Sequence, residues 1–185
     1  TDLDELNKLG MGVALSFELG RIRRNGLTDA TIYEAFSSEL QDQALVFDVS
    51  SPELVEDART KSNLLNDAFR WLQQFGVVPD WPGFDILTLD TRQSNGVDRM
   101  VELKSSGVAS RVQEMTWNEW KTAKASTLRD RFYLYLVGNL RSDLVASHPY
   151  IRTIQNPFEQ MVADVYVSHA SQRKVQLAVN EFLEA

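Results

Sequence analysis

The stretch PGFDILTLDTRQSNGVDRMVELKS, residues 82–105, decides the fold that we expect for this chain. It contains two strand-like runs, 84–89 and 99–105, with Ser94-Asn95-Gly96 between them. Asn-Gly between alternating runs is a strong hairpin signal, because both residues tolerate a positive φ. The stretch therefore predicts an antiparallel hairpin.

Helical and strand-like patterns continue on both sides of this hairpin. Apolar residues recur at helical spacing in the first 24 residues, and Ser51-Pro52-Glu53 combines a hydroxyl cap, a Pro at the first helical position and an acid. The whole order predicts a mixed α/β domain. We expect further helices at residues 2–24, 28–41, 51–75 (with a break), 116–125 and 172–183, and further strands at 44–49, 131–139 and 150–154.

Composition narrows the class of protein. The 185 residues, 43% of them hydrophobic, suffice for one domain with a small appendage. The lack of Cys excludes a disulfide framework and thiolate zinc sites. No apolar run approaches the roughly 20 residues of a membrane span, and the N-terminus does not resemble a signal peptide. We expect a cytoplasmic domain away from membranes; the start at Thr1 without Met is compatible with a fragment of a longer protein.

The net charge of −7 is unevenly distributed. Residues 111–141 hold six cations and three anions, a net charge of +3, so the rest of the chain carries −10. Phosphate binding requires Lys and Arg. The acidic average therefore does not exclude a local basic face that contacts nucleic acid, and a solvated helix flank is the alternative.

Three residues of the hairpin could carry chemistry: Asp85 on the first strand and Glu102 and Lys104 on the second. Side chains two apart on a strand emerge from one face of the sheet. A hairpin can bring the Asp beside the Glu, and two carboxylates on adjacent strands suit Mg²⁺ or Mn²⁺. A neighbouring ammonium can hold a water and stabilise charge on a phosphate. This is minimal equipment for metal-dependent phosphodiester hydrolysis.

The Glu-x-Lys string alone is weak evidence, since Glu119-Trp120-Lys121 repeats it. That second string lies in an expected helix, where residues two apart point in different directions. A structural Glu–Lys pair on an exposed face remains the alternative for Glu102 and Lys104.

Other candidates favour structural interpretations. Trp117 and Trp120 share one helical face and are expected to pack rather than stack on bases. His148 and His169 have no evident third partner for catalysis. Arg21, Arg23 and Arg24 close an expected helix, where cations interact favourably with the C-terminal end of the helix dipole. We prefer this interpretation to a DNA contact. The sequence contains no P-loop, no GxGxxG and no nucleophile elbow.

Five blocks in order resemble a family of domains of unknown function named after the C-terminal domain of the plant protein NO VEIN. Members of this family also occur in large bacterial proteins with helicase or ATPase-like regions, including anti-phage defence systems. The blocks lie in the run from Pro82 to Pro157, which covers about 40% of the chain. They are PGFDILTLD, DRMVELKSSG, QEMTWNEWKTA, FYLYLVGNL and IQNPF.

The resemblance implies a branch of the restriction-endonuclease-like PD-(D/E)xK superfamily. It implies a nuclease-like core at residues 51–185, a mixed sheet flanked by helices, after an N-terminal helical extension at 1–50. It also implies catalytic roles for Asp85, Glu102 and Lys104. It further implies that Asn118 and Glu119, at the start of the helix expected at 116–125, support these three residues.

The family pattern leaves one acid unplaced. Many members of the superfamily carry an additional Glu on the first core helix, and Glu18 and Glu56 compete for that position. Asn63, Asn66 and Asp67 occupy the stretch nearer the expected site. Without this acid, one metal would bind rather than two.

The sequence therefore predicts a Mg²⁺- or Mn²⁺-dependent DNA endonuclease domain, a module of a larger prokaryotic defence or restriction protein containing a helicase or ATPase. Asp85, Glu102 and the Leu103 carbonyl would hold the metal, and Lys104 would position the attacking water. The alternatives are a catalytically inactive nuclease-like module that binds nucleic acid or partner domains, and a purely structural interaction domain. The residues expected to contact DNA phosphates are Arg111, Lys121 and Lys124.

Overall fold

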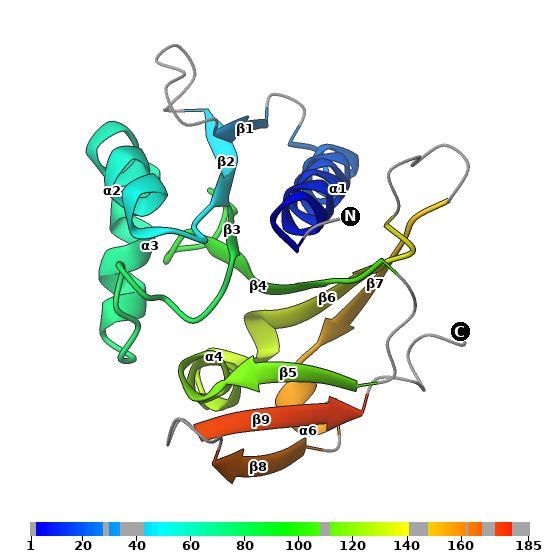
Figure 1. Ribbon diagram of the computed structural model, residues 1–185. Coiled ribbons are helices and arrows are strands. Elements are labelled where there is room, and N and C mark those ends of the chain that lie inside the picture. The colour runs from blue at the N-terminus through cyan, green and yellow to red at the C-terminus, as the bar shows by residue number, and fades with distance from the viewer. Residues whose placement is uncertain are drawn as a thin grey trace. The chain divides into compact units, whose positions relative to one another are not determined.

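The computed structural model of the chain describes residues 3–27, 30–33, 43–107, 112–140, 148–161, 163–167 and 173–178 (Figure 1). It has the predicted α/β class. A mixed six-stranded sheet in the order β1-β2-β3-β4-β6-β7 is flanked by helices, in agreement with a restriction-endonuclease-like core, and a second sheet has the order β5-β9-β8. The chain forms two compact units, residues 15–101 and residues 1–14 with 102–185.

The unit of residues 15–101 is built on four strands. β1 (Thr31–Tyr33) runs parallel to β2 (Ala44–Asp48). β2 pairs antiparallel with β3 (Ile86–Leu89), which pairs antiparallel with the first part of β4 (Val97–Ser105). The predicted hairpin is therefore confirmed as the β3–β4 pair.

The turn of this hairpin differs from the expected two-residue type. The Asp90 amide donates to the Gly96 carbonyl (2.9 Å). The loop between the strands therefore starts at Asp90 and is longer than Asn-Gly alone. Within the Asn95-Gly96 pair, Gly96 alone takes a positive φ, of 77°. Asn95 instead accepts a hydrogen bond from the Val97 amide through its side chain (2.9 Å). The Asn-Gly pair thus ends the loop with an Asx-type bond rather than a mirror-image turn.

The helices α2 (Pro52–Lys61) and α3 (Asn63–Gln73) replace the single broken helix expected at 51–75. The break is at Ser62, which ends one helix and begins the next. Its amide donates to the Ala58 carbonyl (2.9 Å), and its hydroxyl accepts from the Leu65 amide (3.1 Å). One buried residue therefore satisfies both helix ends.

The core of this unit lies against the sheet. α3 buries Leu65, Phe69 and Leu72, which recur at spacings of four and three residues, as an amphipathic helix requires. They pack in a core that includes Phe47 and Leu87, both 0% exposed. α2 and α3 lie on one side of β2 and β3, and the end of α1 (Leu3–Arg24) lies on the other (Figure 1).

The second unit contains the rest of β4 and the remaining elements. In its three-stranded sheet, β9 is central and pairs antiparallel with β5 and β8. α4 lies beside β5 and β9 (Figure 1). The elements are β5 (Val112–Thr116), α4 (Trp117–Lys124), η1 (Arg129–Arg131), β6 (Phe132–Gly138), β7 (Tyr150–Gln155), α6 (Pro157–Gln160), β8 (Ala163–Val167) and β9 (Arg173–Ala178).

The predicted buried strand at 131–139 and its neighbour at 150–154 are confirmed as β6 and β7, which pair antiparallel. The ring of Tyr150 occupies the space that a Cβ at position 138 would fill, so only glycine fits there. Asn156 follows the end of β7, has a φ of 52° and accepts from the Glu159 amide (3.2 Å), so it caps α6. The block IQNPF is thus a strand end followed by a helix cap.

Two predicted helices are wrong. Residues 31–33 of the expected helix at 28–41 form β1, because Ile and Tyr pack well in a strand beside β2; residues 34–42 lie outside the described part of the chain. Residues 173–178 of the expected closing helix form β9, in which Val175 and Leu177 are buried and Gln176 is exposed. Burial that alternates from one residue to the next is the pattern of a strand, not of a helix.

The structure also contains β5 and β8, which the sequence patterns did not predict. Both are short strands that gain their hydrogen bonds from β9, a partner remote in sequence. In the described residues, no helix has an apolar stretch of the length and hydropathy needed to cross a membrane. The predicted division at residue 50 stays a prediction.

Candidate functional site

Asp85 lies in the unit of residues 15–101, immediately before β3. Its amide donates to the Val101 carbonyl (2.7 Å), and its carbonyl accepts from the Val49 amide (2.8 Å). The backbone is therefore fixed between the end of β2 and the strand β4. The residue is partly exposed, between the buried residues Phe84 and Ile86. This backbone pairing fixes the position of residue 85 along the sheet.

Glu102 and Lys104 lie on β4, in the other unit. The Lys104 Nζ is 3.2 Å from Oε1 of Glu102. Both side chains therefore emerge from one face of the strand, as the two-residue spacing predicted. Glu102 is only 4% exposed and follows the fully buried Met100 and Val101. Glu102 therefore does not lie on an exposed face, and a structural role for its pair with Lys104 stays an alternative, because a buried carboxylate needs a charged partner.

Glu119 completes a group of three charged side chains. Its Oε1 lies 3.4 Å from the Lys104 Nζ, so the ammonium is shared by two carboxylates. The same oxygen accepts from the Thr116 amide (2.9 Å), while the Thr116 hydroxyl accepts from the Glu119 amide (3.2 Å). This reciprocal capping box begins α4. The capping box at the start of α4 thereby fixes the position of the Glu119 carboxylate that contacts Lys104.

We expect Thr116→Ala to lower the free energy of unfolding by about 1 kcal/mol, because the Glu119 amide loses its hydroxyl acceptor. Urea denaturation measures the loss. Thr127→Ala is the matched control, since Thr127 is exposed in the turn after α4, and it is expected to stay within about 0.5 kcal/mol of the wild type. Equal stabilities of the two variants would show that the capping box contributes nothing measurable.

The other two residues expected near the site are less closely connected. Asn118 is partly exposed, and its carbonyl accepts a hydrogen bond from the Thr122 hydroxyl (3.2 Å) within α4. Leu103 is partly exposed between Glu102 and Lys104 on β4. The supporting role of Asn118 and the metal-binding role of the Leu103 carbonyl stay predictions.

The residues expected to contact DNA are arranged unevenly. Lys121 is exposed on α4. The Lys124 Nζ instead lies over the ring of Trp117, 4.7 Å from its centroid. Trp120 is 5% exposed and packs on Phe158, with 5.8 Å between the ring centroids, which confirms packing for this Trp. Arg111 and His169 are outside the described residues.

Glu18, one of the two candidates for the additional acid, belongs to a buried ion network in the unit of residues 15–101. It is 0% exposed and accepts from Nε of Arg21 (2.9 Å), with Nη1 of Arg99 at 4.0 Å. Arg21 also donates to Asp98 (2.7 Å). Burial raises the pKa of Glu18, against the lowering effect of Arg21. Two guanidiniums therefore already neutralise this carboxylate.

The sequence patterns did not predict this network. They assigned Arg21 to the end of a helix dipole, whereas its guanidinium pairs with an acid one turn earlier and with Asp98 on β4. The spacing of Glu18 and Arg21, three residues on one helix, was the available signal. Glu56, the other candidate acid, is exposed on α2.

The donor atoms around β4 suit a magnesium ion in kind. Mg²⁺ is commonly bound by one or two carboxylates while it keeps several waters. Asp85 and Glu102 have carboxylate oxygens, and Leu103 has a carbonyl oxygen. The described part of the chain has no group of three or more His, Cys, Asp or Glu side chains that could hold a metal ion. The fit therefore concerns only the kind of donor atoms, and the metal site itself stays a prediction.

Comparison with known proteins gave one match. The family model described as "Protein NO VEIN, C-terminal" matches residues 54–151, just over half of the chain. The matched range contains Asp85, Glu102, Lys104 and the start of α4. Neither the curated proteins nor the solved structures include a match.

Proposed function

We propose, from the premise that the chain belongs to the Protein NO VEIN C-terminal family, that it is a Mg²⁺-dependent DNA endonuclease domain. The observation that carries this proposal is the buried carboxylate of Glu102 with the Lys104 ammonium 3.2 Å away on the same strand. Burying a charged pair costs desolvation energy that an apolar pair would not. A role in phosphodiester hydrolysis would explain why the chain keeps a charged pair at this buried position.

The hairpin register supports the inclusion of Asp85. Its amide bonds to the carbonyl of Val101, the residue that precedes Glu102 on β4. We assign Asp85, Glu102 and the Leu103 carbonyl as the ligands of the metal. When bound, Mg²⁺ would supply Lewis-acid stabilisation of the charge that develops on the phosphate.

The remaining roles follow from the contacts of Lys104. Its ammonium lies 3.2 Å from a carboxylate oxygen of Glu102 and 3.4 Å from one of Glu119. We assign it to orient the water that attacks the phosphorus and to stabilise the negative charge that develops. Glu119 holds the ammonium from the side of α4, and its own carboxylate is held by the Thr116 amide. It acts through Lys104 and is a positioning residue.

We assign the DNA contacts to Lys121, Lys124 and Arg111. Lys121 is exposed and available to a phosphate, and Lys124 pairs an ammonium with the ring of Trp117. The net charge of −7 makes strong binding to DNA by this chain alone unfavourable. We therefore propose that the chain acts within a larger prokaryotic defence or restriction protein of the cytoplasm, with a helicase or ATPase that delivers the DNA.

A second candidate function is a catalytically inactive module for binding nucleic acid or docking partner domains. The observation that favours it is the closed charge group itself, because Glu102 and Glu119 already share the Lys104 ammonium. Such a group can stabilise the junction of β4 and α4 without a metal.

Titration calorimetry with Mn²⁺ separates the two functions. We expect measurable binding to the wild type and a loss of at least about ten-fold in affinity in Asp85→Asn and in Glu102→Gln, because each removes a charged oxygen ligand. Glu114→Gln is the control, since Glu114 pairs with Lys174 on an exposed part of β5, and it should bind Mn²⁺ as the wild type does. Binding that is equal in all four proteins would contradict the proposed ligands.

A further inference from the structure

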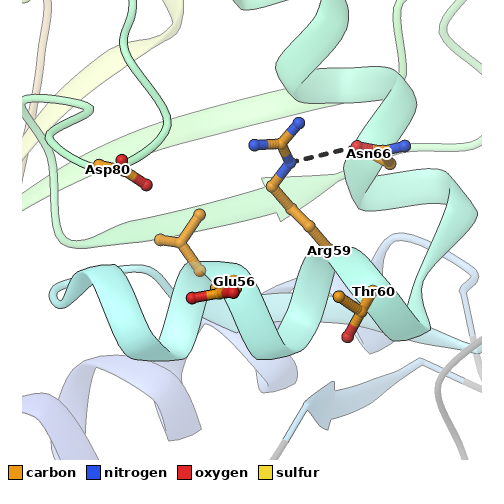
Figure 2. Close-up of a pocket in the computed structure, with 6 residues that line it drawn as sticks. Glu56, Arg59, Thr60, Asn66 and Asp80 are labelled. Atoms are coloured by element: carbon orange, nitrogen blue, oxygen red, sulfur yellow. Dashed lines mark hydrogen bonds between the residues drawn. The ribbon is translucent and has the colours of Figure 1, made fainter.

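A pocket lies between α2, α3 and the turn that precedes β3, within the unit of residues 15–101 (Figure 2). It has a volume of about 260 Å³. None of its residues is among those assigned to the metal, to the attacking water or to the positioning of Lys104. Its lining residues are Val55, Glu56, Arg59, Thr60, Asn66 and Asp80.

Arg59 is held in place before any ligand arrives. Its Nε donates to Oδ1 of Asn66 (3.1 Å), and its Cζ lies 5.8 Å from the ring centroid of the fully buried Phe69. Figure 2 shows the two Nη atoms directed away from Asn66. Because its rotamer is already restricted, a ligand that accepts from both Nη groups would bind at a reduced entropic cost.

Two carboxylates border the same space, from Glu56 on α2 and from Asp80 in the turn (Figure 2). In the described part of the chain, neither lies within ion-pair distance of the Arg59 guanidinium, and both residues are exposed. Two carboxylates and one guanidinium give the pocket a net charge of −1. This charge opposes a phosphate or a carboxylate, and it favours a neutral ligand that offers acceptors to Arg59 and donors to an acid.

We propose that this pocket binds an unpaired guanine base. Guanine presents the O6 and N7 acceptors that a guanidinium contacts with two hydrogen bonds, and its N2 amino group is a donor. An acid of the pocket, Asp80 or Glu56, would accept from that donor. Adenine places an N6 donor where guanine has O6, so it would face Arg59 with the wrong group.

The residue after Asp80 adds a further reason to infer a base. Trp81 is 69% exposed, although a large aromatic side chain usually buries most of its surface, and Val78 at the start of the same turn is 55% exposed. The turn is closed by the Trp81 amide, which donates to the Val78 carbonyl (3.0 Å). An exposed indole one residue after Asp80 offers a stacking surface for a base or its neighbour.

The base would come from single-stranded DNA or from a free nucleoside. In a duplex, O6 and N7 of guanine face the major groove and the N2 amino group faces the minor groove, so one pocket could not contact both. This inference does not depend on the metal ligands of β4. Binding at the pocket is therefore expected in EDTA and in Lys104→Ala, so a failure of the nuclease proposal leaves it intact.

Fluorescence anisotropy with short labelled oligothymidylates tests the proposal. We expect an oligonucleotide with one central guanine to bind about ten-fold more tightly than one with thymine, adenine or cytosine at that position. Inosine lacks the N2 amino group and 7-deazaguanine lacks N7, so each should lose most of that advantage. Guanosine as a competitor separates the two sources: displacement indicates that the base alone suffices, and no displacement indicates that the strand is required.

Arg59→Lys should abolish the preference for guanine, because an ammonium cannot donate in a planar fork. Arg70→Lys is the matched control: Arg70 lies on α3 in an exposed ion pair with Asp67, outside the pocket. A thermal melt confirms that both variants fold, and Asp80→Asn provides a second variant with an unchanged shape. Equal affinity for guanine and thymine in the wild type, or an unchanged preference in Arg59→Lys, would overturn the proposal.

Discussion

We expect Lys104→Ala to reduce Mg²⁺-dependent DNA cleavage by about 10²–10³-fold, the range for loss of a group that stabilises developing negative charge. The reason is geometric. The Nζ of Lys104 lies 3.2 Å from Glu102 and 3.4 Å from Glu119, so no other side chain can replace it at that place on β4. Cleavage of a labelled DNA substrate with Mg²⁺ or Mn²⁺, at saturating metal, measures the effect.

The control for this experiment is a lysine that also pairs with a glutamate but lies outside the proposed catalytic site. Lys174 on β9 contacts Glu114 on β5 (2.9 Å), and Lys174→Ala should cleave as the wild type does. Because Lys104→Ala leaves the buried Glu102 without its ammonium, circular dichroism must show that the variant is folded. A folded Lys104→Ala protein with full cleavage activity would refute the catalytic assignment and favour the inactive module.

We expect Arg21→Met to lower the free energy of unfolding by about 3 kcal/mol, the low end of the range for breaking a buried ion pair. Glu18 is 0% exposed and would lose the guanidinium that bonds it, keeping only Arg99 at 4.0 Å. Asp98 would lose the same partner. Urea denaturation of the variant and the wild type measures the difference.

Two further variants show whether a stranded charge causes the loss. Arg70→Met removes an equivalent residue from the exposed pair with Asp67, and it should cost no more than about 1 kcal/mol. The double variant Glu18→Gln/Arg21→Met also removes the buried carboxylate, so it should regain part of the loss. A double variant no more stable than Arg21→Met would indicate that lost packing, rather than charge, is responsible.

The pH dependence of Arg21→Met follows from the raised pKa of Glu18. Burial raises this pKa above its ordinary value of 4.5, and removal of Arg21 takes away the strongest opposing effect. A group with a raised pKa in the folded state favours folding below its unfolded value and loses that contribution as the pH rises through the folded value. The deficit of Arg21→Met is therefore expected to be largest near neutral pH and to shrink toward pH 4.5. A deficit that is constant from neutral pH to pH 4.5 would contradict this.

The local patterns of the sequence predicted the elements that are decided by neighbouring residues. The Ser51-Pro52 start of α2 and the Thr116 cap of α4 form as expected, because a hydroxyl satisfies an amide only three residues away. The β3–β4 hairpin was predicted for the same reason, since its strands are joined by one loop. The same-face placement of Glu102 and Lys104 needed only the two-residue period of a strand.

Elements whose partners are remote were predicted poorly. β9 has a short alternating pattern that also fits one side of a helix, and it is a strand because β5 and β8 pair with it on both sides. β1 is a strand because β2 runs parallel to it. Strand pairing depends on residues far away in the chain, which no local window contains.

The features of the two proposed sites can also be separated into those that depend on local spacing and those that depend on tertiary contacts. The sequence alone determined the order of the blocks, the hairpin with Asp85, and the pair of Glu102 and Lys104, because these depend on spacing along one segment. The tertiary structure alone decided that Glu119 shares the Lys104 ammonium and that Arg59 is oriented toward a pocket with Asp80. Charged side chains contact partners brought to them by folding, so only the packed chain shows which carboxylates are neutralised and which face open space.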